Sequence, residues 1–384
     1  MYKEQNILLN ETKIKYKPKK YKIGIKRLKN ILNKRKNLKV GKSIKMQKNL
    51  KTIILIIILV IFIIAMSLIF RKVMRITNSN KKYKNYIPIA FSLNDNYVYP
   101  LIVLLTSILY NSSPDTFYLF YLLLHPDLQE TKIKKILGVK DKYQNCKFEL
   151  IHMGNNYSNY PKGYNKSAAI YYRLELPDLI TDRDKIIYLD VDTIVHKDLT
   201  DMYNIDMGIY YYMGIPDHDI NNFQFHGKRN FINSGVLLIN LKNLREVNST
   251  ILYRDYYDKH GTLKVDEYLI NAVFYNNISF LPFIYGLPDI GAGSDITVST
   301  AHYCNEFHFH VNCTEYDMDL ASKNRAITHN CYEEYKWWQK NYTNLTDIGK
   351  QWLFYASKSN AFEEICKKYN QFESQCEKLK KENK

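Results

Sequence analysis

From residue 86 onward, short apolar runs alternate with helix-like segments, and this alternation limits the possible folds more than any other feature of the chain. Strands are expected at residues 86–93, 116–124, 147–153, 185–195 and 235–241, with helices at 97–110 and 127–138. Strands that alternate with helices build a largely parallel sheet with helices on both faces. The sequence therefore predicts an α/β fold.

Asp190 and Asp192 follow the apolar run 186–189. In an extended segment, residues i and i+2 point the same way, so both carboxylates can face one site. The carboxyl ends of parallel strands are where such sheets bind ligands, and paired carboxylates suit Mg²⁺ or Mn²⁺ bridging phosphates. Asp-x-Asp is a short motif, and a pair of surface aspartates at a strand end is the alternative interpretation.

The N-terminal region differs from the rest of the chain in charge and in apolar character. Residues 1–51 hold 18 Lys and Arg but only two acids, so the net charge of +17 belongs to a tail. The apolar run 53–70 has one polar residue, and its length of ~27 Å is close to that of a hydrocarbon core. We expect a basic cytosolic tail at 1–51, a transmembrane signal anchor at 52–70 and a short stem at 71–85. RNA binding by the tail, a buried core helix and a cleaved signal peptide are the alternatives.

Six cysteines and eight Asn-x-Ser/Thr triplets follow the apolar run. The cysteines are Cys146, Cys304, Cys313, Cys331, Cys366 and Cys376, and the triplets begin at Asn111, Asn156, Asn165, Asn248, Asn277, Asn312, Asn341 and Asn344. An even number of cysteines on one side of an anchor suits an oxidising lumen and up to three disulfides. The prediction is a single-pass type II membrane protein of the Golgi or ER with a lumenal catalytic domain.

Two longer blocks give the Asp-x-Asp motif a context. Residues 171–180 lead into 182–192, and residues 231–241 follow later. In these blocks the chain resembles glycosyltransferase family 8, which includes glycogenin and the bacterial lipooligosaccharide galactosyltransferases. The resemblance runs from about residue 89 to about residue 338. It implies the nucleotide-sugar-binding fold called GT-A, a UDP-sugar donor, a divalent metal (Mn²⁺ or Mg²⁺) and transfer with retention of anomeric configuration.

The resemblance also implies roles for individual residues on the donor side. Asp190 and Asp192 would bind the metal and the diphosphate, and Arg173 would face the donor. The opening strand and turn would bind uridine through Asn94, Asp95, Asn96 and Tyr97. The family often has aspartate where Asn94 stands, and an asparagine can still bond to a base edge. The sugar pocket would be lined by Asn233 and Gly235.

Three acidic residues would act closer to the transferred sugar. By the resemblance, Asp217 orients sugar hydroxyls and Asp266 holds the transferring sugar. Glu267 stands where the family usually has Gln, and a carboxylate there can stabilise an oxocarbenium-like charge or attack it. The alternative for Glu267 is an acid on a helix surface.

The family's third metal ligand is a histidine followed by Lys-Pro-Trp. His329 is chosen here because Lys336 and Trp337 follow it, although the spacing from His to Lys is one residue longer than in the family and the Pro is missing. By the resemblance, Lys336 would bind the diphosphate. His302 is the competing candidate, but it lacks the following Lys. The Cys and His residues of 302–313 also allow a structural zinc site as an alternative.

The combined prediction is a GT-A catalytic domain at 86–345 with a helical extension at 346–384. It would move a hexose, galactose or glucose before xylose, from a UDP-sugar to a hydroxyl of a glycan, glycoprotein or glycolipid. The alternative is a catalytically impaired protein that binds sugar nucleotides. No nucleic-acid partner is expected, because residues 52–384 hold 37 basic and 36 acidic residues.

Overall fold

The computed structural model describes residues 53–67, 83–155, 157–160, 167–216, 231–260, 266–286, 325–329 and 347–382. The chain divides into two compact units, residues 1–81 and 82–384. The second unit contains the sheet and begins close to residue 86, where the α/β pattern starts. The predicted boundary between residues 345 and 346 falls inside this unit and stays a prediction.

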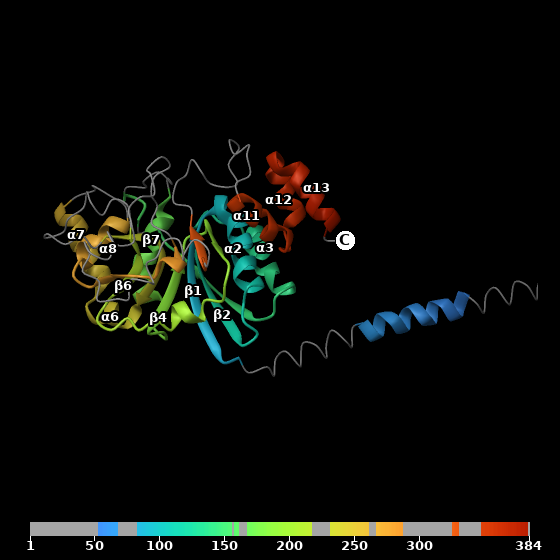
Figure 1. Cartoon of the computed structure of the whole chain (residues 1–384), viewed down its shortest axis with the longest axis horizontal. Helices are drawn as coiled ribbons and strands as arrows, with labels where there is room; N and C mark the ends of the chain where they lie inside the picture. Colours follow the sequence, from blue (N-terminus) through green and yellow to red (C-terminus); the bar gives the residue numbers. More distant parts are fainter. Residues whose placement is uncertain are drawn as a thin grey trace, which may run out of the picture. The chain divides into compact units, whose positions relative to one another are not determined.

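The described helix within the N-terminal apolar run covers residues 53–67 and is blue in Figure 1. A hydrocarbon core of about 30 Å requires about 20 helical residues, and this helix is shorter. In the part of the chain that the structure describes, no helix combines the length and the apolar character needed to cross a membrane. The predicted signal anchor at 52–70, the type II topology and the Golgi or ER localisation are therefore wrong.

A seven-stranded sheet lies at the centre of the second unit, in the order β3-β2-β1-β4-β7-β6-β8 among the described residues. The strands are β1 (Asn85–Leu93), β2 (Thr116–Leu124), β3 (Cys146–His152), β4 (Lys185–Leu189), β6 (Tyr212–Pro216), β7 (Ile232–Asn240) and β8 (Ile278–Phe280). β1 is parallel to β2 and β4, β2 to β3, and β6 to β8, whereas β7 is antiparallel to both neighbours. The predicted α/β fold with a largely parallel sheet is confirmed.

The predicted strand at 185–195 is two strands in the structure. β4 ends at Leu189, and β5 (Thr193–Val195) leaves the main sheet to pair with β9 (Ile327–His329). Between them, the Asp190 carbonyl accepts hydrogen bonds from the N–H (3.2 Å) and the Oγ1 (2.8 Å) of Thr193. The Asp-x-Asp motif therefore lies in a turn at the carboxyl end of β4, where ligands bind to such sheets.

Helices cover both faces of the sheet, and each face has its own apolar core. Because neighbouring strand residues point to opposite faces, Ile89 and Phe91 of β1 enter one core while Ala90 enters the other. The first core includes α2 (Val98–Tyr110) and α3 (Glu130–Leu137). The second includes a 3₁₀ helix (Ala168–Glu175), α4 (Leu176–Leu179), α6 (Leu241–Glu246), α7 (Ser249–His260) and α8 (Asp266–Phe274).

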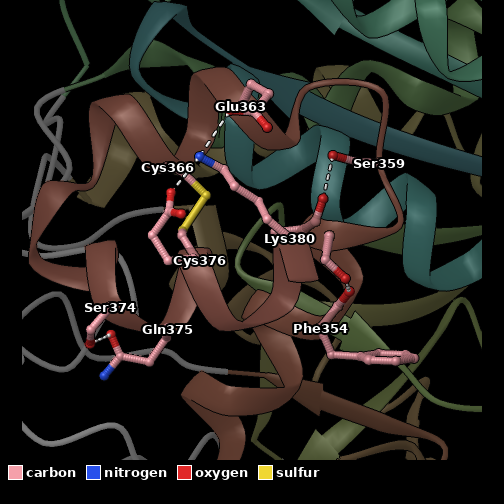
Figure 2. Close-up of a disulfide and its surroundings, with 11 residues drawn as sticks. Phe354, Ser359, Glu363, Cys366, Ser374, Gln375, Cys376 and Lys380 are labelled. Carbon is pink, nitrogen blue, oxygen red and sulfur yellow. Dashed lines mark hydrogen bonds and ion pairs between the residues drawn. A yellow bond between two sulfur atoms is a disulfide. The ribbon is translucent and has the colours of Figure 1, made fainter. Parts of the chain in front are cut away.

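Three C-terminal helices pack onto the first core beside α2 and α3 (Figure 1). They are α11 (Asp347–Ser357), α12 (Phe362–Lys368) and α13 (Glu373–Glu382). Trp352 of α11 is fully buried there, and a disulfide between Cys366 and Cys376 joins α12 to α13 (Figure 2). This is one of the up to three disulfides expected. Cys146 is a buried free thiol, and the other three cysteines lie outside the described residues.

Asn111, the first residue of an Asn-x-Ser/Thr triplet, has a structural role. Its side-chain Nδ2 lies 2.9 Å from the carbonyls of Ser107 and Val195 and 2.8 Å from the hydroxyl of Tyr355. These contacts join α2, β5 and α11. A glycan on this nitrogen would break them, so the folded chain uses this triplet for packing.

Candidate active site

A cleft of about 440 Å³ lies at the carboxyl ends of β1 and β4. These strands are parallel neighbours, with Ala90 opposite Tyr188, so the segments that follow them come together at the same edge of the sheet. The cleft is lined by Ser92, Leu93, Asn94, Tyr97, Ser167, Ala169, Ile170, Arg173, Tyr188, Asp190, Val191 and Asp192. Five of these residues are predicted site residues: Asn94, Tyr97, Arg173, Asp190 and Asp192.

Arg173 connects the cleft to the residues behind it. Its side chain is only 4% exposed, and its guanidinium lies 2.8 Å from Asp190 Oδ1 and 3.0 Å from Asp266 Oδ2. It also donates to the carbonyls of Ile170 and Ser234 and lies over the Tyr188 ring. Burial acts to lower the pKa of Arg173, but the two carboxylates raise it above its ordinary value. The cation is therefore permanent and held in one orientation.

Asp190 is fixed from three directions. Its Oδ1 accepts hydrogen bonds from Arg173 and from the Tyr188 hydroxyl (3.0 Å), and its backbone N–H donates to the Gly235 carbonyl (2.8 Å). The carboxylate is 28% exposed and lines the cleft. Tyr188 was not among the predicted site residues, although it lies two residues before Asp190, a spacing that in extended backbone puts both side chains on one face.

Asp192 and His329 come together through the small sheet. β5 begins one residue after Asp192, and its first residue, Thr193, pairs with His329. The backbone of His329 thus lies across from the residue that follows the Asp-x-Asp motif. His302 lies outside the described residues, so the choice of His329 over His302 stays a prediction.

Asp190 and Asp192 offer the kind of ligand that a divalent ion requires. Both are carboxylates that line the same cleft, and hard oxygen ligands fit Mg²⁺ or Mn²⁺. Among the described side chains, no group of three or more His, Cys, Asp or Glu could hold a metal ion. The His329 side chain is outside that set, so a third protein ligand stays a prediction.

Asp266 begins helix α8 and is buried, with 3% of its surface exposed. Burial raises its pKa to about 6, and the charge of Asp190 adds to the rise while Arg173 opposes it. Two acids therefore share one buried cation, and protonating or removing either acid changes how much negative charge surrounds Arg173.

Glu267 is half-buried and faces the start of β7, where its Oε2 accepts a hydrogen bond from the Ser234 N–H (2.9 Å). One helical turn later, the fully buried Asn271 accepts from the Ile232 N–H and donates to the Ile232 carbonyl, both at 2.8 Å. These bonds fasten α8 to β7. Glu267 is therefore directed toward the sheet, in contrast to the alternative of an acid on a helix surface.

The turn after β1 places its four predicted residues differently. Asn94 and Tyr97 line the cleft, and Asn94 Oδ1 accepts from the Asn96 N–H (3.0 Å), which caps the short 3₁₀ helix Asp95–Tyr97. Asp95 forms an ion pair with Lys132 of α3, and Asn96 is exposed. Neither is among the described residues that line the cleft, so their donor contacts stay predictions.

The remaining predicted residues lie beside the cleft or outside the described residues. Asn233 Oδ1 accepts from the Gly235 N–H (2.8 Å), and both residues lie in the first half of β7, where the Gly235 carbonyl accepts from the Asp190 N–H. Asp217 and Lys336 fall outside the described residues, as does the segment 302–313 of the zinc alternative.

The family model described as "Glycosyl transferase family 8" matches residues 88–313, which is more than half of the chain. The chain belongs to glycosyltransferase family 8. The match covers the cleft and most of the strands described above, whereas the chain spans less than two thirds of the length of the first curated relative below. The predicted resemblance to this family is confirmed. The matched region includes every described site residue except His329.

Curated relatives and solved structures agree with this membership. A putative glycosyltransferase of Haemophilus influenzae is 29% identical, over 50% of this chain and 61% of its own length. General stress protein A of Bacillus subtilis is 25% identical, over 48% and 67%. The galactosyltransferase LgtC, solved with donor and acceptor sugar analogs, has a TM-score of 0.57 at 21% identity, over 71% of this chain and 96% of its own. The structural likeness supports a GT-A-type fold.

Proposed function

We propose that this family 8 member transfers a hexose, galactose or glucose, from a UDP-sugar to an acceptor hydroxyl of a glycan, glycoprotein or glycolipid, with retention of anomeric configuration. The observation that carries the proposal is the buried Arg173 between Asp190 and Asp266 at the edge of the cleft. A fixed cation flanked by two acids can place one acid toward a diphosphate and the other toward a sugar without moving during the reaction.

The roles of the side chains follow from their positions. Asn94 and Tyr97 would hold the nucleotide, because both line the cleft at the end of β1. Arg173 would keep Asp190 and Asp266 in place, with Asp266 binding the sugar hydroxyls. Glu267, held by the Ser234 N–H, would face the developing positive charge. The sequence-based assignments add Asp217, Asn233 and Gly235 to the sugar pocket and Lys336 to the diphosphate.

The proposed site requires a divalent ion, Mn²⁺ or Mg²⁺. Asp190 and Asp192 would hold it together with His329, and when bound it would supply a Lewis acid that offsets charge on the leaving diphosphate. Two observations support this proposal. The sequence has two carboxylates that line the cleft, and β5 pairs with β9 so that the backbone of His329 lies opposite Thr193.

The decisive test measures UDP release by the full chain from UDP-galactose and UDP-glucose, with Mn²⁺ or with EDTA. Asp192→Asn should lower turnover at least about 100-fold and weaken UDP binding. Asp184→Asn is the matched control, because Asp184 is an 83% exposed aspartate just before the other end of β4. Full activity in EDTA or in Asp192→Asn would refute the metal-dependent mechanism. Binding of UDP without release from any donor would instead support the impaired-transferase alternative.

A further inference from the structure

The turn that carries Asn94 and Tyr97 is held by residues on either side of it. Asp95 forms an ion pair with Lys132 of α3. Tyr99, in the first turn of α2, lies two residues after Tyr97. Fixing Asp95 and Tyr99 therefore fixes the backbone of Tyr97 between them.

Tyr99 is held by the C-terminal helix α12. Its hydroxyl donates to Glu364 Oε2 (2.8 Å), and the Lys368 Nζ lies 4.9 Å from the centre of its ring. The ring of Tyr369 meets it edge-on, with the centroids 6.5 Å apart. Glu364, together with Lys368 and Tyr369 about one turn later, thus contacts one tyrosine of α2.

Glu364 also links α12 to α3. Its Oε2 accepts from Lys135 as well as from Tyr99, and these two donors hold the pKa of the Glu364 carboxyl below its ordinary range. α3 thus has two lysines near the turn: Lys132 pairs with Asp95, and Lys135 pairs with Glu364. One oxygen of Glu364 therefore joins α12, α3 and Tyr99.

α12 is itself anchored. Ile365 is fully buried in the first core, and Cys366 is joined to Cys376 of α13. Figure 2 shows Lys380 of α13 directed toward Glu363, with 3.1 Å between Lys380 Nζ and Glu363 Oε2. Glu363, the neighbour of Glu364, thus pairs with α13. A helix fastened at these points can transmit a fixed position to Tyr99, which a loose tail could not.

We propose that Glu364 is a positioning residue for donor binding: through Tyr99 it holds the Asn94–Tyr97 turn in the shape that receives the nucleotide. This inference rests on the proposed function. It assigns a role in the donor site to a residue more than 250 positions away in the sequence and outside the region that the family model matches.

The test compares Glu364→Gln with Glu363→Gln in the full chain. Glu363→Gln is the matched control because it changes the same charge on the same helix without touching Tyr99. Glu364→Gln should raise the donor KM and the UDP Kd about threefold to fivefold, as expected for a partly exposed charged contact, with kcat within about twofold. Glu363→Gln should leave both within about 1.5-fold. A melting temperature equal to wild type would show that the KM change is local.

A second variant separates positioning from general destabilisation. Tyr99→Phe removes only the hydroxyl and should reproduce the KM rise of Glu364→Gln. In the Tyr99→Phe background, Glu364→Gln should add less than about 1.5-fold, because the hydroxyl through which Glu364 acts on Tyr99 is already absent.

Three outcomes would each overturn the inference while leaving the proposed function intact. The first is equal UDP affinity in Glu364→Gln and wild type, and the second is an equal effect of Glu364→Gln and Glu363→Gln. The third is full additivity of Glu364→Gln with Tyr99→Phe. A wild-type chain that binds no UDP would overturn both.

Discussion

The buried Asp266 should make the metal-free protein lose stability as the pH rises from about 5 to about 7. Its pKa is raised from 3.8 to about 6 in the folded chain. A group with a raised folded pKa stabilises the fold below its unfolded pKa, and this contribution is lost as the pH rises through the folded pKa. The window of loss is therefore pH 3.8 to about 6, where the folded chain holds a proton that the unfolded chain has released.

The size of the effect follows from the same two values. Between them, each pH unit changes the free energy of unfolding by about 1.4 kcal/mol for one proton. At pH 5 the group is about one unit below its folded pKa, and near pH 7 almost nothing of its contribution is left. The expected loss from Asp266 alone is therefore about 1 kcal/mol. Arg173 stays charged throughout, because its own pKa is raised.

The assay is urea unfolding in EDTA near pH 5 and near pH 7, for the wild type and for Asp266→Asn. Asparagine cannot titrate, so the variant should lose about 1 kcal/mol less than the wild type over this interval, and titration of all other groups cancels in the comparison. The same pH dependence in both proteins would refute the reasoning. An Asp266 pKa lowered by Arg173 would give that same result, because the group would then be ionised in both the folded and the unfolded chain across this interval.

Three further outcomes are expected. Glu267→Gln should lower kcat and leave the donor Kd nearly unchanged, because the amide oxygen can still accept from Ser234; a kcat within about twofold of wild type would reject a catalytic role. His329→Ala should reduce metal-dependent turnover far more than His302→Ala, and the opposite ranking would show that the third ligand was misplaced. Asn271→Ala should cost about 2–4 kcal/mol in urea unfolding, since it leaves both backbone groups of Ile232 unsatisfied; a cost under about 1 kcal/mol would contradict this.

Local patterns predicted the elements whose cause is local. The apolar run 116–124 is β2 to the residue, and the helix expected at 97–110 is α2 from residue 98. The run 185–195 was expected as one strand because every residue around the Asp-x-Asp motif favours extended backbone. Its division depends on β9, more than 130 residues later, and no local pattern encodes that partner. The short strands β6 and β8 were missed for the same reason.

The site shows the same limit. The resemblance named Arg173, Asp190 and Asp266, but their ion pairs join segments up to 93 positions apart, so only the fold shows that they share one buried charge. The predicted membrane anchor is overturned by a finding of another kind, because no helix among the described residues is long and apolar enough to cross a membrane. Glu364 carries no sequence signal, because its partners lie on α2 and α3.

The single reversed strand in the sheet has a consequence for how this chain can diversify. Because β7 runs opposite to β4 and β6, Pro216 at the end of β6 pairs with Ile232 at the start of β7, on the edge where the cleft opens. The connection between them leaves and rejoins the sheet at that edge. Residues between 217 and 230 could be exchanged or lengthened by evolution or by design without shifting the register of any strand. Such changes would leave Arg173 and its two acids in place.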